Sequence, residues 1–273
     1  MGRVIVVGSL NVDIVTRVER HPAPGETVLG EAGGRFAGGK GGNQAMAARR
    51  AGADVTMVAA VGTDDAGSAY VARLERAGIE PRVQRRPEDP TGTALITVDE
   101  AGENSIIVVA GANSRLRPEP LDLGAAGGDV VLISLEVDLE AVCHVARRAH
   151  AAGARVVLNL APYAVLPPDV IALADPVVVN ESEMRQLADS DLVPESLLVT
   201  FGAAGARWGP HGVDGLPVAA GEIGDTVGAG DAFCGALAAA LASGADTQAA
   251  LEAANAAGAA AVRWVGAQPD AAL

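Results

Sequence analysis

The chain has 273 residues, of which 49% are hydrophobic and only 3% aromatic, and its formal net charge is −14. This length suits one large α/β domain, and the scarcity of aromatic residues indicates a core of small, closely packed side chains. The acidic balance argues against a nucleic-acid partner, which would need clusters of Lys and Arg, but it does not exclude an anionic ligand, because backbone N–H groups can bind phosphate.

The ends and cysteines of the sequence give no targeting or metal signal. The first apolar run, at residues 4–7, is too short for a signal sequence, and every longer apolar stretch is broken by Gly, Pro or charge. Cys143 and Cys234 form no CxxC pair, and the four histidines lack metal-ligand spacing. We therefore expect a cytoplasmic protein with reduced thiols and no membrane partner.

Predicted strands and helices alternate along most of the chain. Strands are expected at 4–7, 55–61, 130–134, 155–160, 177–179 and 197–200, and helices at 43–51, 66–77, 138–152, 181–188, 229–243 and 247–263. This alternation predicts a three-layer α/β/α sandwich around a mostly parallel sheet. A β-hairpin at 93–109 and an extended stretch at 12–36 interrupt it, and we expect both to form a small β-structured flap on a single domain, 1–273.

The most informative local motif is DTVGAGD at residues 225–231, which leads directly into a predicted helix. Gly228, Ala229 and Gly230 let backbone N–H groups approach a ligand, and the helix dipole favours negative charge there, as on a transferred phosphoryl group. Asp231 at the helix start can accept a proton from an attacking hydroxyl. An ordinary acidic residue at the start of a helix, after a glycine-rich turn, explains the same motif equally well.

A second glycine-rich segment, GGRFAGGKGGN at residues 33–43, nearly matches a P-loop. We reject that interpretation because Gly41 stands where Ser or Thr must hold Mg²⁺, and no good strand precedes the segment. The glycines allow close approach of the backbone to a ligand, with donors on Lys40 and Asn43. We favour a binding segment for a polyhydroxylated ligand over a flexible glycine-rich loop, because the helix predicted to begin at Asn43 anchors the segment.

Polar residues also follow two predicted strands, where ligands of open α/β sheets bind. Asn11 and Asp13 alternate with Val12, so both can face one side and bind vicinal hydroxyls, although a plain polar turn is the alternative. Asn180 and Glu183 either form a helix capping box or hold Mg²⁺ and its waters near the phosphates of ATP. The absence of GxGxxG and GxSxG argues against a dinucleotide oxidoreductase and an α/β-hydrolase.

The order of the motifs carries more information than any one of them. GSLNVD, HPAPGETV, GGKGGNQA, GENSIIVVAGAN, LNLAPYAVLP, NESE, VTFGAAG, DTVGAGDAF and GAQPD follow one another from about Val4 to Asp270. This series closely resembles the ribokinase-like (PfkB-type) sugar kinases. The resemblance implies a twisted α/β sheet, a β-sheet lid over the sugar at roughly 13–34 and 90–110, and a homodimer in which two lids clasp.

The resemblance also implies an ATP-dependent kinase that uses Mg²⁺ and a monovalent cation, usually K⁺. Asp231 would be the base, with an anion hole at Gly228, Ala229 and Gly230. The sugar contacts would be Asn11, Asp13, Gly39, Lys40, Asn43, Glu136 and Asp231. ATP would be lined by Thr200, Gly202, Gly205, Gly230 and Asn255, with Asn180 and, through water, Glu183 near Mg²⁺. The monovalent cation would lie by Asp225, Val227, Ala261, Trp264, Gly266 and Asp270.

The acceptor and the nucleotide side leave alternatives open. D-ribose is the acceptor that the resemblance favours, and a ketohexose, 2-keto-3-deoxygluconate or a nucleoside are alternatives within the family. A non-catalytic sugar- or nucleotide-binding regulator is the alternative of another class. Two departures from the family pattern can loosen ATP binding or change nucleotide preference: residues 188–196 are too few for the helix usual there, and no final helix follows Asp270.

Overall fold

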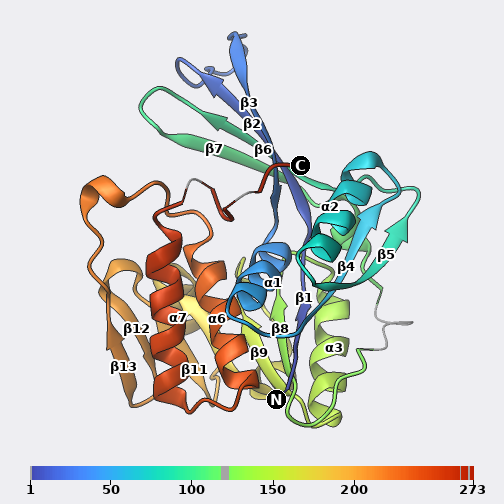
Figure 1. Cartoon of the computed structure of the whole chain (residues 1–273), viewed down its shortest axis with the longest axis vertical. Helices are drawn as coiled ribbons and strands as arrows, with labels where there is room; N and C mark the ends of the chain where they lie inside the picture. The colour runs from blue at the N-terminus through green and yellow to red at the C-terminus, as the bar shows by residue number, and fades with distance from the viewer. Residues whose placement is uncertain (1, 118–122, 265, 270) are drawn as a thin grey trace.

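The computed structural model describes residues 2–117, 123–264, 266–269 and 271–273. Within them the chain forms a larger sheet covered by helices and a smaller sheet that projects from its edge (Figure 1). The nine strands of the larger sheet lie in the order β13 (His211–Asp214), β12 (Gly205–Trp208), β11 (Leu197–Thr200), β10 (Ala174–Asn180), β9 (Arg155–Asn159), β8 (Val130–Ser134), β1 (Val4–Val7), β4 (Val55–Gly62) and β5 (Glu80–Arg86). From β11 to β5 they are parallel, and β12 and β13 are antiparallel additions.

Helices cover both faces of this sheet. One face packs against α1 (Lys40–Arg50), α2 (Asp65–Arg76), α6 (Ala229–Ala242) and α7 (Thr247–Ala261), and the other against α3 (Leu139–Ala151), α4 (Pro168–Ala172) and α5 (Glu181–Ala188). In β1, Val4 and Val6 enter the first core while Ile5 and Val7 enter the second. A strand buried on both faces must be continuously apolar, which explains the run VIVV. The predicted three-layer α/β sandwich is confirmed.

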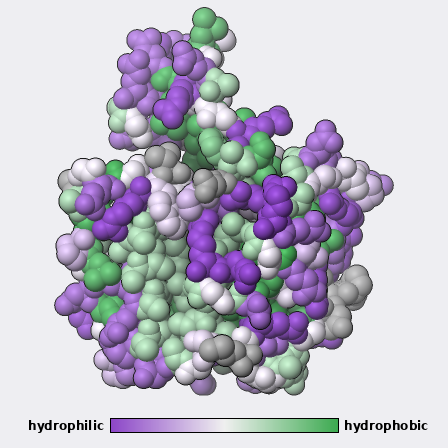
Figure 2. All heavy atoms as spheres, viewed as in Figure 1, coloured by the Kyte–Doolittle hydropathy of each residue, from purple (hydrophilic) through white to green (hydrophobic). Residues whose placement is uncertain are grey.

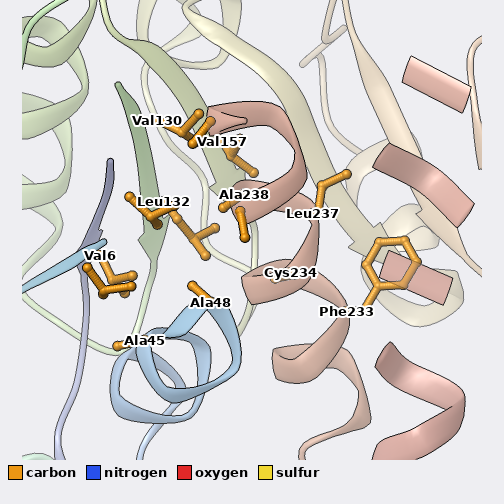
Figure 3. Close-up of a cluster of buried hydrophobic side chains, with 14 of the residues drawn as sticks. Val6, Ala45, Ala48, Val130, Leu132, Val157, Phe233, Cys234, Leu237 and Ala238 are labelled. Atoms are coloured by element: carbon orange, nitrogen blue, oxygen red, sulfur yellow. The ribbon is translucent and has the colours of Figure 1, made fainter. Parts of the chain in front are cut away.

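Small side chains set the distance between α1 and α6. Ala45 and Ala48 of α1 and Ala238 of α6 belong to one buried cluster with apolar residues of the central strands (Figure 3). A Cβ atom on Gly235 of α6 would lie 2.4 Å from the carbonyl oxygen of Gln44, so the two backbones are almost in contact. This close packing brings the first turn of α6 next to the side chains of Asn43 and Gln44.

The smaller sheet has the order β3 (Gly30–Gly38), β2 (Asn11–Val18), β6 (Gly92–Val98) and β7 (Asn104–Val109), and we call it the lid sheet. β2 pairs antiparallel with β3 and parallel with β6. The end of the chain returns to its base (Figure 1), where the N–H of Ala37 donates to the carbonyl of Ala271 at 2.6 Å and that of Leu273 to Arg35 at 3.1 Å. The C-terminal residues are therefore attached to the lid sheet.

The remaining segments are short, and the surface is uneven in polarity. Short 3₁₀ turns lie at Gly111–Arg115, Gly202–Ala204 and Ala220–Glu222. Hydrophobic residues gather over α6 and α7 on the face shown in Figure 2, whereas much of the lid sheet is hydrophilic there. Across the described ranges, every helix is too short or too polar to cross a membrane.

Candidate active site

Polar side chains from distant parts of the sequence meet at the carboxyl ends of the parallel strands. A cavity of about 120 Å³ lies there, and the predicted site residues in its lining are Lys40, Asn180, Glu183, Thr200, Gly228, Gly230 and Asp231. A larger hollow of about 460 Å³ lies at the end of the lid sheet and is lined by none of the predicted site residues. The smaller cavity is therefore the candidate site, at the edge where ligands of open α/β sheets bind.

Asp231 is the third residue of α6 and only 7% exposed. Its carboxylate accepts hydrogen bonds from Nδ2 of Asn43 at 2.9 Å and Nε2 of Gln44 at 3.0 Å. Burial raises the pKa of Asp231, and the Lys40 ammonium and the two amides oppose that rise only in part. An ordinary acid at a helix start would face solvent, so the buried, amide-bound carboxylate favours the functional interpretation.

Gly228 shapes the turn before Asp231. It is the N-cap of α6 with φ 80°, a left-handed conformation that glycine adopts without strain. A Cβ atom there would lie 2.5 Å from Cα of Ala267, so the C-terminal segment packs directly on this turn. The N–H of Ala229 approaches the carbonyl of Thr226 at 3.4 Å, and the N–H groups of the first helical turn have no partner within α6.

Lys40 is the cation of the site. Burial lowers the pKa of its ammonium, but the carboxylates of Asp231, Glu136 and Glu183 outweigh burial and raise it overall. Glu136 is itself held in place, since its Oε2 accepts the hydroxyl of Ser9 and the backbone N–H of Lys40, the latter at 3.1 Å. Lys40 therefore remains charged and links the acidic groups around it.

The glycines near Lys40 serve packing inside a helix, which corrects the expectation of a loop ending at Asn43. Helix α1 begins at Lys40, after the N-cap Gly39 with φ 85°. A Cβ on Gly41 would lie 2.6 Å from the carbonyl carbon of Gly8, and one on Gly42 would lie 2.0 Å from the Tyr70 hydroxyl. These two glycines let the first turn of α1 press against the end of β1 and against α2 rather than expose backbone to a ligand.

Asn11 and Asp13 begin β2 as it enters the lid sheet. The side-chain oxygen of Asn11 accepts from Nδ2 of Asn113 at 2.8 Å, and Asn113 is fixed in turn by the backbone of Leu10. Asp13 lies against Gly38, where a Cβ would come within 2.2 Å of its carboxylate. Burial and the neighbouring Glu136 raise the pKa of Asp13 to about 7.

Asn180 and Glu183 form the capping box that was one of the two expected roles, and their position at the cavity leaves the Mg²⁺ role as a prediction. The Asn180 side chain accepts the backbone N–H of Glu183 at 2.9 Å, and the Glu183 carboxylate accepts that of Asn180 at 2.8 Å. This pair is a complete capping box for α5. Both residues also line the cavity, where burial raises the pKa of Glu183 against the opposing effects of Asn180 and Lys40.

Three of the predicted nucleotide residues do not line the cavity that contains Thr200. Gly202 is exposed, with open space around it. Gly205 has φ 103°, and a Cβ there would meet the carbonyl oxygen of Val213 at 2.1 Å, so strand pairing explains this glycine. Asn255 donates to the carbonyl of Asp214 at 2.9 Å and thereby joins α7 to β13.

The segments predicted to hold a monovalent cation lie side by side. The Asp225 carboxylate accepts the N–H of Val227 at 3.0 Å and that of Gly266 at 3.3 Å, and the N–H of Trp264 donates to Ala261 at 3.0 Å. Asp270 lies outside the described residues. The described residues contain no group of three or more His, Cys, Asp and Glu suited to a metal ion, which leaves a site of backbone carbonyls untested.

Sequence reasoning missed several buried polar residues of the site. Gln44 binds the catalytic candidate directly, Asn159 lines the cavity, and Gln268 donates to Asn43 at 2.7 Å. Gln44 and Gln268 lie inside two of the quoted motifs, GGKGGNQA and GAQPD, so their positions in those motifs were the available signal. Their partners are far away in sequence and could not be assigned from it.

Comparisons with known proteins show the family to which the chain belongs. Residues 1–272 match the model of the pfkB family of carbohydrate kinases. The chain is 38% identical over 284 residues to a ribokinase of Bacillus subtilis, covering 98% of this chain and 95% of that protein. It is 34% identical over 263 residues to a bifunctional ribokinase/ribose-5-phosphate isomerase A of Fructilactobacillus sanfranciscensis, covering 88% of this chain but spanning about half, 49%, of that protein. The structure of Arabidopsis thaliana ribokinase complexed with ribose and ATP matches with a TM-score of 0.86 at 29% identity, over 98% of this chain and 95% of that one. The resemblance inferred from the ordered motifs is confirmed.

Proposed function

The chain belongs to the pfkB family of carbohydrate kinases, and we propose on that premise that it phosphorylates D-ribose at its 5-hydroxyl. That it is an ATP-dependent sugar kinase follows from the family and its relatives. The observation that carries the proposal is the buried Asp231 carboxylate, held by two side-chain amides inside the cavity. Ribose is the proposed acceptor because the relatives named above are ribokinases.

The residues of the cavity divide the work of the transfer among them. Asp231 accepts the proton of the sugar hydroxyl, and its raised pKa brings its basicity closer to what that step needs. The N–H groups of the first turn of α6, with the helix dipole, stabilise negative charge that develops on the transferred group. Lys40 adds a fixed positive charge beside them. Bound ATP supplies the phosphoryl group.

The donor set of the cavity fits a divalent cation. Lys40 lies among three carboxylates, so its single charge cannot also neutralise nucleotide phosphates. Mg²⁺ is a hard cation that prefers oxygen ligands and keeps several waters, and Asn180 and Glu183 offer such oxygens at the cavity wall. We assign these two residues to Mg²⁺, with Glu183 acting through water. When bound, the ion supplies charge neutralisation for the phosphates.

A monovalent cation, K⁺, is proposed at the segments that contain Asp225 and Gly266. The two segments approach closely, since a Cβ on Gly224 would lie 2.8 Å from the carbonyl oxygen of Trp264. Carbonyl oxygens that converge in this way suit a large cation of low charge density. Turnover measured with K⁺ and with tetramethylammonium as the replacement tests the assignment, and equal rates in both salts would contradict it.

The decisive experiment is ADP release with a panel of sugars, using wild type, Asp231→Asn and the control Asp138→Asn. Asp231→Asn removes the base and should lower kcat with ribose by on the order of 10²-fold or more. Asp138 caps α3 on the opposite face of the sheet, and Asn caps helices equally well, so the control should keep wild-type turnover. Turnover with a ketohexose, 2-keto-3-deoxygluconate or a nucleoside, but not with ribose, would show that the proposed acceptor is wrong. It would leave the assignment of Asp231 as the base unchanged.

A non-catalytic sugar- or nucleotide-binding regulator is the alternative of another class, and the family and its relatives argue against it. It is motivated by residues 188–196, which are too few for the helix that the family usually has there. Protection of the fold by ribose or ATP without any ADP release would support it. We further propose a cytoplasmic location, in keeping with the free cysteines Cys143 and Cys234, and a homodimer through the lid sheet.

A further inference from the structure

A chain of hydrogen bonds leads from α2 to the catalytic candidate through the C-terminal segment. Nη2 of Arg73 donates to Oε1 of Gln268 at 3.0 Å, Nε2 of Gln268 donates to Oδ1 of Asn43 at 2.7 Å, and Nδ2 of Asn43 donates to Oδ2 of Asp231 at 2.9 Å. Gln268 is 1% exposed, and Asn43 and Asp231 are each 7% exposed. The chain is therefore largely shielded from solvent between Gln268 and the carboxylate.

The direction of this chain is fixed by its first member. A guanidinium group only donates, so the side-chain oxygen of Gln268 must face Arg73 and its NH₂ group must face Asn43. Asn43 then has to present its oxygen to Gln268 and its NH₂ group to Asp231.

Turning the amide of Asn43 over would break both of its hydrogen bonds at once. Its NH₂ group would meet the NH₂ group of Gln268, and its oxygen would meet the carboxylate of Asp231. Gln44 has no comparable constraint, since its Oε1 is buried without a partner among the described residues. Of the two amides that bind Asp231, only that of Asn43 is oriented by a second hydrogen bond, on its oxygen.

We propose that Gln268 is a positioning residue for the phosphoryl transfer, which holds the Asn43 amide so that Asp231 stays an acceptor-only carboxylate ready to take the sugar proton. The inference rests on the proposed function, because it assigns Asp231 as the base. A hydrogen bond donated to a carboxylate favours its ionised form, whereas an oxygen facing it favours the protonated form. Without Gln268, Asn43 is free to turn, and Asp231 holds its proton to higher pH.

The residues next to Gln268 in the sequence connect it to two other parts of the site. Ala267, just before Gln268, packs on Gly228 at the N-terminus of α6. Ala271, three residues after Gln268, accepts a backbone hydrogen bond from β3 of the lid sheet. The segment that orients the base is thus attached both to the anion-binding turn and to the base of the lid sheet.

The test compares Gln268→Met and Gln268→Glu with wild type in single-turnover rates from pH 5 to 9. Met keeps the length of the side chain and removes both hydrogen bonds. Glu keeps an acceptor for Arg73, so the segment stays attached, but it cannot donate to Asn43. Both variants should move the acidic limb of the profile to higher pH by about one unit, so that rates on that limb fall about tenfold. Gln248→Met, the same change at a half-buried glutamine of α7 that bonds Gly212 and Glu252 away from the cavity, should leave the profile unchanged.

The outcomes separate this inference from the proposed function. If either folded variant keeps the acidic limb of wild type, or loses rate equally at every pH, Gln268 does not position the base and the inference is wrong. If neither variant folds, Gln268 is held for stability and the inference is equally overturned. Asp231→Asn is measured alongside: if it retains turnover, the base assignment and the inference both fail. If it is inactive while the Gln268 profiles match wild type, only the inference fails.

Discussion

Four carboxylates and a single ammonium share the space between β2, α1, α5 and α6. Asp13 and Glu136 repel each other, while Lys40 attracts Asp231, Glu136 and Glu183. One ammonium cannot neutralise four carboxylates in a partly buried space, so at least one of them should be protonated near neutral pH. Asp13 is that group, because burial and Glu136 together bring its pKa to about 7.

Sugar binding should therefore weaken as the pH falls below about 7. We expect an ionised Asp13 to accept hydrogen bonds from sugar hydroxyls at both oxygens, and protonation would remove part of that capacity. The KM of wild type for ribose should rise by up to about tenfold per pH unit below this value, whereas Asp13→Asn should have a higher KM that no longer varies with pH over this range. Equal pH dependence in the two proteins, measured from initial rates at saturating ATP, would contradict the assignment.

The same carboxylate should make the sugar-free protein less stable at high pH. Its pKa is about 7 in the folded chain against 3.8 for an unperturbed carboxyl, so between these values the folded state binds the extra proton and stability falls as the pH rises. At pH 8 Asp13→Asn should gain on the order of 1–2 kcal/mol in the free energy of unfolding, a discounted value because the side chain is only partly buried. The gain should shrink towards pH 5 in urea titrations.

At this scale the sequence pointed to residues that the structure gathers at one cavity, but not to how their side chains are held. Asp231 stood out because a glycine-rich turn precedes it at a helix start. Its partner Gln44 is 187 residues away, and Gln268 is 225 residues from Asn43. Such contacts depend on the packing of α1, α6 and the C-terminal segment, which no local pattern encodes.

Among the elements, the first turn of α5 does two jobs that substitutions can separate. Glu183→Gln keeps the capping box, because Gln can accept the same backbone N–H, but it removes the charge that faces the cavity. The free energy of unfolding should stay within about 0.5 kcal/mol of wild type, while the Mg²⁺ concentration for half-maximal rate should rise several-fold. An unchanged Mg²⁺ requirement would show that Glu183 acts only in the capping box and not on Mg²⁺.

Asn180→Ala is the matched variant for the capping role. Ala cannot accept the N–H groups of Ser182 and Glu183, so stability should fall by about 1 kcal/mol whether or not nucleotide is present. Thermal unfolding with and without ATP and Mg²⁺ measures this loss. If the loss appears only with nucleotide, the cap contributes nothing and the side chain acts on the ligand alone.

Elements with strong periodicity were predictable, and those set by tertiary pairing were not. The central strands and long helices were expected near their observed bounds because each has a continuous apolar run or an apolar face. β5, with the sequence EPRVQRR, is a charged edge strand, and α4 is a single turn of five residues, so neither has a usable pattern. The start of α1 was expected too late because glycines disfavour helices in general, whereas here Gly41 and Gly42 are required by close packing.

For the whole molecule, the alternation of strands and helices was enough to predict the layered sheet, since parallel strands need helical crossovers on both faces. The lid sheet was expected as β structure, but its strand order was not. Its centre is the parallel pairing of β2 with β6, in which Asn11 lies opposite Gly92. Two strands so far apart in sequence carry no local signal that they are neighbours.

The lid sheet should join two copies of the chain. It is a four-stranded sheet with apolar side chains exposed on both faces of β7: Val108 and Ile106 share the face of Asp13, while Ile107 lies opposite Leu95 on the other. Ile106 is 47% and Ile107 is 64% exposed, more than a small sheet leaves uncovered without a partner.

Light scattering of wild type should give the mass of a dimer. Either Ile106→Lys or Ile107→Lys should shift the protein to a monomer, because a charged side chain in an apolar interface cannot be paired. The variant that becomes monomeric shows which face of the lid sheet is buried in the dimer. Leu216→Lys, at an exposed leucine outside the lid sheet, is the control and should stay dimeric. A monomeric wild type, or a dimer unaffected by both lid variants, would show that the lid sheet does not hold two chains together.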